Sequence, residues 1–275
     1  MTWIPAYGIA KAKVRLNQQS TEAGPASAIT HLALQFWTPT VDGGVAQVTK
    51  FGLMSDAIIG EWRDWSHSRG IRALLCVYNG SGGWDWGLAR KGFAEHPQPF
   101  ADALAAEAER LGLDGVDIDL EGDGPFDGDK PAFLAFVQSL SEKLHGQGKQ
   151  LFVDSFSYIW NAPNQHWWHD LFPLVDGLTT MGYEETGSTA SGWRAYSAQV
   201  TAAWGSVEKL LIGMPSHLDR WCEVGAIDQV AWVVKDGGPG LAIWDVQLES
   251  ETWRTPEIWR QIALISRKEA KADAK

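Results

Sequence analysis

The sequence predicts a single (β/α)8 barrel of the TIM type that spans residues 1–275. Three observations predict this fold. The length suits one barrel, which takes about 250 residues. Short apolar or β-branched runs alternate along the chain with longer amphipathic runs. The acidic run 114–122 also lies between two helical patterns, and a strand held between helices is typical of a parallel sheet that is buried on both faces.

Eight strands and seven later helices follow from hydrophobic periodicities of two and of 3.6. The strands are expected at residues 3–9, 31–37, 72–78, 115–120, 150–156, 177–183, 209–214 and 241–244. The helices are expected at residues 56–68, 100–111, 131–145, 166–172, 193–204, 227–235 and 256–268. Strands that alternate with helices in this way are the signature of a parallel barrel.

Three segments depart from this regular pattern. The first crossover, residues 11–28, contains Gly24-Pro25 and no convincing amphipathic helix, so an irregular connection is expected there. After the second strand, Asp42-Gly43-Gly44 is a hairpin signal, which predicts a small β-ribbon at the barrel mouth. The charged tail 268–275 is expected to fray.

Charge and composition restrict the partners. The chain has 34 acidic against 23 basic residues and a net charge of −11, which argues against nucleic acid or anionic lipid. No apolar run approaches the roughly 18 residues of a membrane span, and the start lacks a signal-peptide pattern, so either a cytoplasmic protein or a matured form is expected. A monomer is expected. Cys76 and Cys222 are interpreted as buried free thiols, and a disulfide between them stays open.

The run 114–122 places three acids on one face of a strand. Alternation puts Asp117, Asp119 and Glu121 on the same side, about 6 to 7 Å apart. An exposed antiparallel edge strand with an acidic face is the simpler explanation, but the flanking helices favour a buried position. Buried acids are costly unless they are paired, hydrogen-bonded or functional.

Tryptophan is unusually frequent, with 16 residues against 5 tyrosines. Many tryptophans must fill the core, because they fall within the helical patterns. Aromatic faces also stack on the apolar face of a sugar ring, so tryptophans at strand ends are candidates for carbohydrate contact.

The acidic run carries a family resemblance. Asp114-Gly115-Val116-Asp117-Ile118-Asp119-Leu120-Glu121 matches the DGxDxDxE signature of family 18 glycoside hydrolases, which include chitinases and endo-β-N-acetylglucosaminidases. The resemblance implies a barrel with its site at the C-terminal ends of the strands.

Three other stretches resemble the same family. Gly80-Ser81-Gly82-Gly83-Trp84 is similar to its SxGG segment, with a glycine in place of the leading serine. Met181-Gly182-Tyr183-Glu184 is similar to MxY(D/N), and Trp244 falls where the family has the tryptophan under the −1 sugar. With Tyr7 and Phe36 from the first two predicted strands added, the candidate substrate-binding residues are Trp244, Tyr7, Phe36, Gly82, Gly83, Trp84, Glu184 and Met181.

The resemblance implies a retaining mechanism assisted by the substrate. Glu121 would be the general acid, and Asp119 would orient the 2-acetamido group that attacks the anomeric carbon. Asp117 would share a proton with Asp119, Tyr183 would donate its hydroxyl to the acetamido oxygen, and Trp244 would support the sugar ring. No metal-ligand set and no nucleotide motif appears, so no metal and no cofactor are expected.

The leading hypothesis is hydrolysis of β-linked N-acetylglucosamine glycans in chitin-like oligosaccharides, peptidoglycan-related glycans or N-glycan cores. A non-catalytic chitinase-like lectin or inhibitor is one alternative, and the retained Glu121 argues against it. A retaining glycosidase with Glu184 or Asp154 as nucleophile is another, and activity on sugars that lack the 2-acetamido group would favour it. The exact glycan and the choice between exo and endo action stay open.

Overall fold

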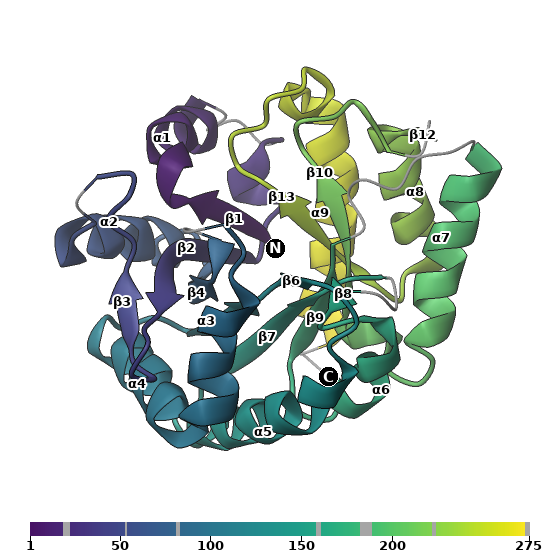
Figure 1. The fold of residues 1–275 in the computed structure, drawn as a ribbon. Helices are drawn as coiled ribbons and strands as arrows, with labels where there is room; N and C mark the ends of the chain where they lie inside the picture. Colours follow the sequence, from purple (N-terminus) through teal and green to yellow (C-terminus); the bar gives the residue numbers. More distant parts are fainter. Residues whose placement is uncertain are drawn as a thin grey trace.

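The computed structural model describes residues 1–18, 23–52, 54–80, 83–157, 161–181, 189–221 and 224–272. Eight parallel strands form a closed barrel in the centre of the molecule (Figure 1), and their order confirms the predicted fold. They are β1 (Thr2–Pro5), β2 (His31–Pro39), β4 (Arg72–Tyr78), β5 (Gly115–Asp119), β7 (Gln150–Ser155), β9 (Gly177–Thr180), β10 (Leu210–Pro215) and β13 (Gly240–Trp244). The barrel closes because β1 pairs in parallel with both β2 and β13.

The helices lie outside the strands, from α1 and α2 on one side of Figure 1 to α7 and α8 on the other. The described helices are α1 (Ile9–Gln18), α2 (Asp56–His67), α3 (Trp86–Arg90), α4 (Pro97–Arg110), α5 (Lys130–Gly146), α6 (Trp168–Leu171), α7 (Thr189–Ala202), α8 (Ala226–Asp236) and α9 (Pro256–Ala272). Short strands add β3 (Val45–Gln47) and the antiparallel pairs β6 (Gly122–Asp123) with β8 (Asn161–Ala162) and β11 (Arg220–Trp221) with β12 (Val224–Gly225). None of the described helices is long and apolar enough to cross a membrane.

Local sequence explains where the helices begin and end. Ser55 caps α2, because its side chain accepts a hydrogen bond from the Ile58 N–H. Proline stands in the first turn of both α4 and α5, where its missing N–H costs nothing. Gly237 ends α8 in the left-handed conformation, with φ 69°, which a residue without a Cβ adopts easily.

The apolar side chains form two layers, because strand residues alternate between the helices and the barrel interior. The outer layer lies between strands and helices, and in it Phe100 and Phe136 stack with ring centroids 5.0 Å apart. The inner layer is much smaller. It consists of Met1, Trp3, Ala33, Leu74, Cys76, Phe152 and Ala242, with Leu211 and Trp244 packed against it. The barrel interior is therefore partly filled by other, polar side chains.

The structure of the first crossover differs from the sequence prediction, because it contains a helix. β1 ends at Pro5, a short 3-10 turn spans Ala6–Gly8, and the ten-residue helix α1 follows, where no convincing helix was expected. Ala12 and Leu16, one helical turn apart, are buried, which gives α1 its apolar side. The prediction took Ile9 as the end of the strand and treated residues 11–28, with Gly24-Pro25, as one irregular crossover. At the other end, α9 continues to Ala272, beyond the start of the predicted tail.

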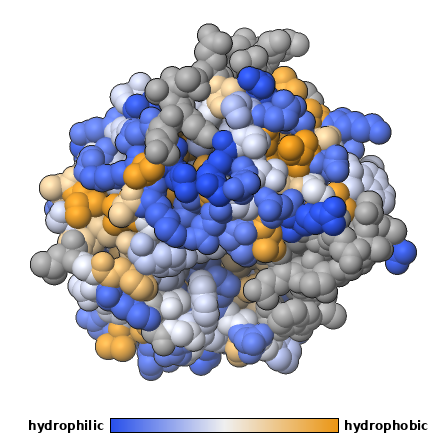
Figure 2. Space-filling view, turned by 90° about the horizontal axis from the view of Figure 1, so that it is seen from above, coloured by the Kyte–Doolittle hydropathy of each residue, from blue (hydrophilic) through white to orange (hydrophobic). Residues whose placement is uncertain are grey.

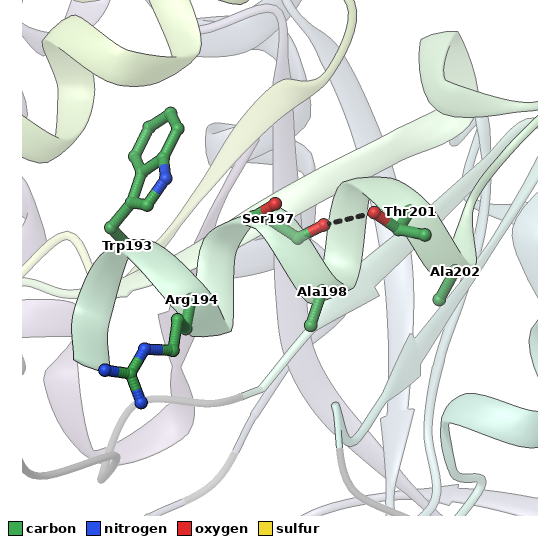
Figure 3. Close-up of a pocket in the computed structure, with 6 residues that line it drawn as sticks. All are labelled: Trp193, Arg194, Ser197, Ala198, Thr201 and Ala202. Carbon is green, nitrogen blue, oxygen red and sulfur yellow. Dashed lines mark hydrogen bonds between the residues drawn. The ribbon is translucent and has the colours of Figure 1, made fainter. Parts of the chain in front are cut away.

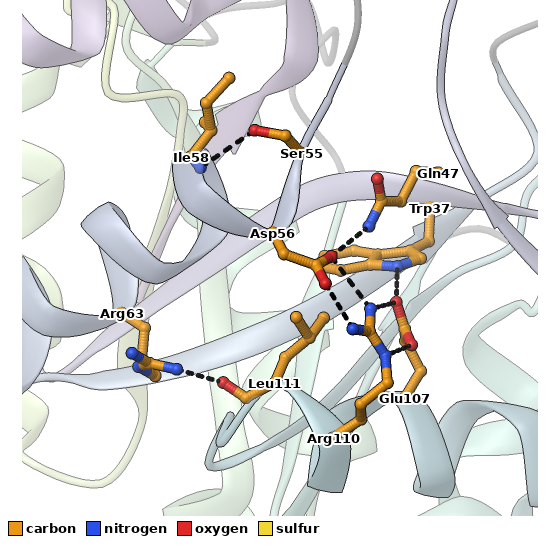
Figure 4. Close-up of polar contacts among 9 residues, drawn as sticks. All are labelled: Trp37, Gln47, Ser55, Asp56, Ile58, Arg63, Glu107, Arg110 and Leu111. Carbon is orange, nitrogen blue, oxygen red and sulfur yellow. Dashed lines mark hydrogen bonds and ion pairs between the residues drawn. The ribbon is translucent and has the colours of Figure 1, made fainter.

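The predicted ribbon after the second strand is confirmed. β3 pairs with the end of β2 in antiparallel register, and Gly43 takes a φ of 80° in the turn. Figure 4 shows how polar contacts attach this ribbon to the helices. Arg110 on α4 bonds both Asp56 on α2 and Glu107, Glu107 accepts the Trp37 indole N–H at 3.1 Å, and Gln47 donates to Asp56 at 3.3 Å.

One face of the molecule is mainly hydrophilic. On the face shown in Figure 2, hydrophilic residues predominate and hydrophobic ones form small separate patches. The monomeric state expected from the sequence stays a prediction.

Candidate active site

The acidic run forms β5 and turns two carboxylates into the barrel. Asp117 is completely buried and Asp119 is 2% exposed, whereas Val116 and Ile118 point toward the helices. β5 lies between β4 and β7, and its register places Asp117 beside Cys76 on β4. The side chains of β5 therefore alternate as the sequence predicted, with acids inside the barrel and apolar residues against the helices.

Asp117 lies deep in the barrel and is held from β1. The Trp3 indole N–H donates to Asp117 Oδ2 at 2.8 Å, and the Cys76 thiol also hydrogen-bonds this carboxyl. Burial raises the pKa of Asp117 above its usual value, and the hydrogen bond from Trp3 partly offsets that rise.

Asp119 lies between Asp117 and Glu121 and is held from β2. The Gln35 amide donates to Asp119 Oδ2 at 2.6 Å, and Glu121 hydrogen-bonds the same carboxyl. Burial raises the pKa of Asp119, while the bonds from Glu121 and Gln35 favour its ionised form. A hydrogen bond between two carboxyl groups requires a proton, so Asp119 and Glu121 share one.

Glu121 lies two residues beyond the end of β5, at the barrel mouth, and is half-buried. Burial raises its pKa well above the usual value, and the charge of Asp119 together with the hydrogen bond between the two groups raises it further. The Asn79 side chain, just after β4, bonds both polar groups of the Glu121 backbone. Its amide N–H donates to the Glu121 carbonyl at 2.7 Å, and its amide oxygen accepts from the Glu121 N–H at 2.9 Å. The position of Glu121 is thus fixed by a neighbouring strand.

A fourth carboxyl, Asp154 on β7, joins this cluster and is 2% exposed. Burial and the charges of Asp117 and Asp119 raise its pKa well above the usual value. Within the described part of the chain, Asp117, Asp119 and Asp154 each keep one buried carboxyl oxygen without a hydrogen-bond partner. Such groups destabilise the folded state, so the cluster is difficult to explain by packing alone.

Trp244 ends β13 on the inner side of the barrel. It packs against the inner layer, with its ring centroid 5.8 Å from that of Trp3, which bonds Asp117. Tyr7 is 51% exposed in the turn after β1, and its ring meets Phe51 edge-on at 5.4 Å. A pocket of about 480 Å³ opens between Tyr7 and Trp244. Aromatic rings thus lie at the mouth near the acids.

The comparison of sequences decides the family. The family model described as Glycosyl hydrolases family 18 matches residues 13–274, which is nearly the whole chain. The chain belongs to this family. Among curated proteins, no relative matches it.

Solved structures share the family 18 fold at low sequence identity. A chitinase from Chromobacterium violaceum is 18% identical, with 95% of this chain and 98% of that chain covered and a TM-score of 0.73. The spore cortex-lytic enzyme SleL from Bacillus cereus is 13% identical, covers 96% of this chain and 73% of that chain, and has a TM-score of 0.67. A class V chitinase from Nicotiana tobaccum is 13% identical, with 95% and 97% covered and a TM-score of 0.68. The chain is thus a family 18 member, and it shares the fold of these chitinase structures.

The segment similar to the family 18 SxGG motif also reaches the mouth. Trp84 is 43% exposed with a φ of 57°, and its ring meets that of Tyr78 at 6.3 Å. The same ring lies over Gly80, where a Cβ atom would come within 2.9 Å of it. A side chain at this position would therefore have to displace the Trp84 ring. The neighbouring Gly83 has a φ of 115°, which favours glycine.

Several predicted site residues are not brought to the mouth or cannot be placed. The prediction that Phe36 contacts the substrate is wrong. Its side chain is completely buried in the outer layer, on the helix side of β2, where it cannot contact a sugar. Met181 is buried just after β9. Gly82, Tyr183 and Glu184 lie outside the described residues, as does Cys222, so their predicted roles stay predictions. Cys76 is a buried free thiol.

Sequence reasoning missed three side chains that hold the acids, namely Asn79, Gln35 and Trp3. Each comes from a different strand, so no motif in the run 114–122 points to them. One signal was present: Gln35 is a polar residue within the otherwise apolar segment 32–37.

A second pocket lies away from the acids, along helix α7 (Figure 3). Trp193, Arg194, Ser197, Ala198, Thr201 and Ala202 line it. It contains no carboxylate, and the Thr201 hydroxyl is already bonded to the Ser197 carbonyl at 2.7 Å. No group of three metal-binding side chains occurs among the residues that the structure describes.

Proposed function

We propose that this family 18 protein hydrolyses β-linked N-acetylglucosamine glycans with retention of configuration, using the 2-acetamido group of the substrate as the nucleophile. The observation that carries the proposal is the chain of buried carboxyls from Asp117 through Asp119 to Glu121. It provides a protonated acid at the mouth next to a carboxylate that can accept an N–H group.

The first step breaks the glycosidic bond. Glu121, kept protonated by its raised pKa, gives its proton to the glycosidic oxygen as the bond to the anomeric carbon breaks. The acetamido carbonyl oxygen attacks this carbon from the other side and forms a cyclic oxazolinium ion. Asp119 accepts a hydrogen bond from the acetamido N–H and stabilises the positive charge.

The second step restores the enzyme. Water attacks the anomeric carbon and opens the oxazolinium ring, and the Glu121 carboxylate takes a proton from this water. Configuration is retained because the same carbon is attacked twice. In the pair of Asp117 and Asp119, Asp117 carries a proton, which limits the repulsion between these two close buried carboxyl groups.

The comparisons support a first choice of substrate class for this proposal. Two of the similar structures are described as chitinases and one as a spore cortex-lytic enzyme. Chitin-like oligosaccharides are therefore the first substrates to test. Hydrolysis of chitooligosaccharides, peptidoglycan and glycoprotein glycans should be compared with one purified preparation. Turnover of the chitooligosaccharides supports the proposal, and lack of turnover on all three contradicts it.

Asp154 gives a specific reason to test a second mechanism, because it is another carboxyl in the same cluster. A carboxylate nucleophile would form a covalent sugar ester, which a fluorosugar substrate can trap for mass spectrometry. We expect no adduct on Asp154 or Glu184, and competitive inhibition by a thiazoline analogue of the cyclic intermediate. An adduct on either residue would contradict substrate assistance.

A further inference from the structure

The pocket between Tyr7 and Trp244 is distinct from the carboxyl cluster that performs the proposed chemistry. It measures about 480 Å³ and lies where β10, β13 and β1 end. Tyr7 and Trp244 provide aromatic walls, whereas the other lining residues are polar or charged: Lys11, Ser216, His217, Asp245, Gln247 and Glu249. Two aromatic faces with polar groups between them suit a sugar ring.

The charges in this pocket are unequal. Two carboxylates, Asp245 and Glu249, face one ammonium group, and that group, Lys11 Nζ, is paired with Glu249 at 2.5 Å. Asp245 is 6% exposed, and both its carboxylate oxygens accept hydrogen bonds from Gln247. In the described part of the chain, no basic side chain forms an ion pair with it. Burial raises the pKa of Asp245, while the hydrogen bonds from Gln247 favour its carboxylate form. With Asp245 ionised, the pocket has one more carboxylate than ammonium group.

The phenol of Tyr7 experiences the same negative field. Burial raises the pKa of Tyr7 to about 12, and the charges of Asp245, Glu249 and Asp119 all raise it as well. A cation bound beside Tyr7 would be attracted by the groups that disfavour the phenolate.

We propose that this pocket binds a hexosamine ring with a free ammonium group, next to the N-acetylated ring that is cleaved. The natural substrate would then be a partly de-N-acetylated glycan. The proposal rests on the proposed function. The family resemblance puts the N-acetylated ring at Trp244, so this side chain would contact both neighbouring rings. The proposal also separates the candidate substrates, because the lactyl or peptide carboxylates of peptidoglycan would be repelled by this pocket and by the net charge of −11.

The test measures binding, so that it does not depend on turnover. Chitotetraose is compared with four tetrasaccharides, each de-N-acetylated at a different ring, by calorimetry on the Glu121→Gln variant. We expect one tetrasaccharide to bind about two- to five-fold more tightly than chitotetraose, which is the usual range for one exposed charge pair. This preference should shrink in 0.5 M salt, since salt screens exposed charges.

Two matched variants of the ion pair give opposite predictions. Glu249→Gln removes a carboxylate and frees Lys11, so it should abolish or reverse the preference. Lys11→Met removes the ammonium and frees Glu249, so it should increase the preference by about two- to five-fold. If the ion pair only holds the structure, both variants should change binding in the same direction.

The outcomes separate this inference from the proposed function. Equal binding of all five sugars, or changes of the same sign in both variants, would overturn the ammonium pocket and leave hydrolysis of chitooligosaccharides intact. Failure of wild-type protein to cleave chitotetraose would contradict the proposed function, while a charge-dependent binding preference would still support the pocket.

Discussion

Asn79 holds Glu121 by both polar groups of its backbone, at 2.7 Å from the carbonyl oxygen and 2.9 Å from the nitrogen. The contact occurs where the pairing of β4 with β5 has ended, because the last paired residues are Tyr78 and Asp119. The Asn79 side chain therefore continues the connection between the two strands by one more residue. It fixes the proposed acid without touching its carboxyl group.

Replacing Asn79 should consequently affect turnover more than binding. Asn79→Ala removes both bonds, and we expect kcat to fall about 10- to 100-fold while KM changes little, because the acid loses its position relative to the glycosidic oxygen. Steady-state kinetics on chitooligosaccharides measures both constants, and thermal unfolding controls for stability. An equal loss through KM alone would contradict this positioning role.

Ionisation of Asp154 should lower the free energy of unfolding at neutral and alkaline pH. Its folded-state pKa is raised, so the stability that it contributes is fully present below its unfolded pKa of about 4 and is lost as pH rises through the folded value. Asp154→Asn cannot ionise, and we expect it to gain more than about 1 kcal/mol in the free energy of unfolding at pH 8. Urea unfolding of wild type and variant measures this difference.

The pH range of this comparison matters because the titration of His31 changes stability with pH in the opposite direction. Burial lowers the pKa of His31 to about 4, so its contribution is lost as pH falls from about 6.5 toward that value. The comparison should therefore be made between pH 7 and 9, where His31 is neutral in both states. Equal stability of the variant and wild type across this range would show that Asp154 is not held against its ionisation.

The raised pKa of Glu121 predicts the alkaline side of the activity profile. Glu121 must be protonated to act, so kcat should fall as pH rises through its raised folded-state pKa. Gln35→Leu removes the bond that favours the Asp119 carboxylate, so more of the shared proton should pass to Asp119. A changed pH profile is expected, and an identical profile in the two proteins would contradict the coupling between these carboxyls.

Trp244 and Tyr183 should differ in their effects. Trp244→Ala removes the ring beside Trp3, and we expect oligosaccharide binding to weaken by about 1 to 3 kcal/mol. Tyr183→Phe removes only a hydroxyl, which the family resemblance assigns to the acetamido oxygen, so it should reduce mainly kcat. Calorimetry and kinetics separate the two, and unchanged binding by the Trp244 variant would place the sugar elsewhere.

The barrel could be predicted because its strands are short apolar runs between amphipathic helices, a pattern that local sequence carries. Helix α1 was missed for a local reason as well: it follows the strand after only one short turn, so its first residue, Ile9, was included in the strand. The hairpin was predicted correctly because Asp42-Gly43-Gly44 is a turn signal that requires no tertiary context.

The site could be predicted only as far as one strand determines it. Alternation along β5 placed Asp117 and Asp119, but their partners come from β1 and β2, and sequence does not determine register between distant strands. Phe36 was misplaced because β2 has apolar residues on both faces, and the single polar residue within the segment 32–37, Gln35, was not enough for periodicity to show which face points inward. An irregularity between Gln35 and Trp37 further interrupts the alternation of β2.

Glu121→Gln tests the central claim most directly, because it removes the transferable proton and keeps the size of the side chain. Hydrolysis and binding of chitotetraose should be measured for this variant, with Glu142→Gln on the exposed side of α5 as the matched control. We predict that Glu121→Gln lowers kcat by at least about 10²-fold with binding nearly unchanged, and that the control behaves as wild type. Hydrolysis by Glu121→Gln at a rate close to that of wild type would contradict the account.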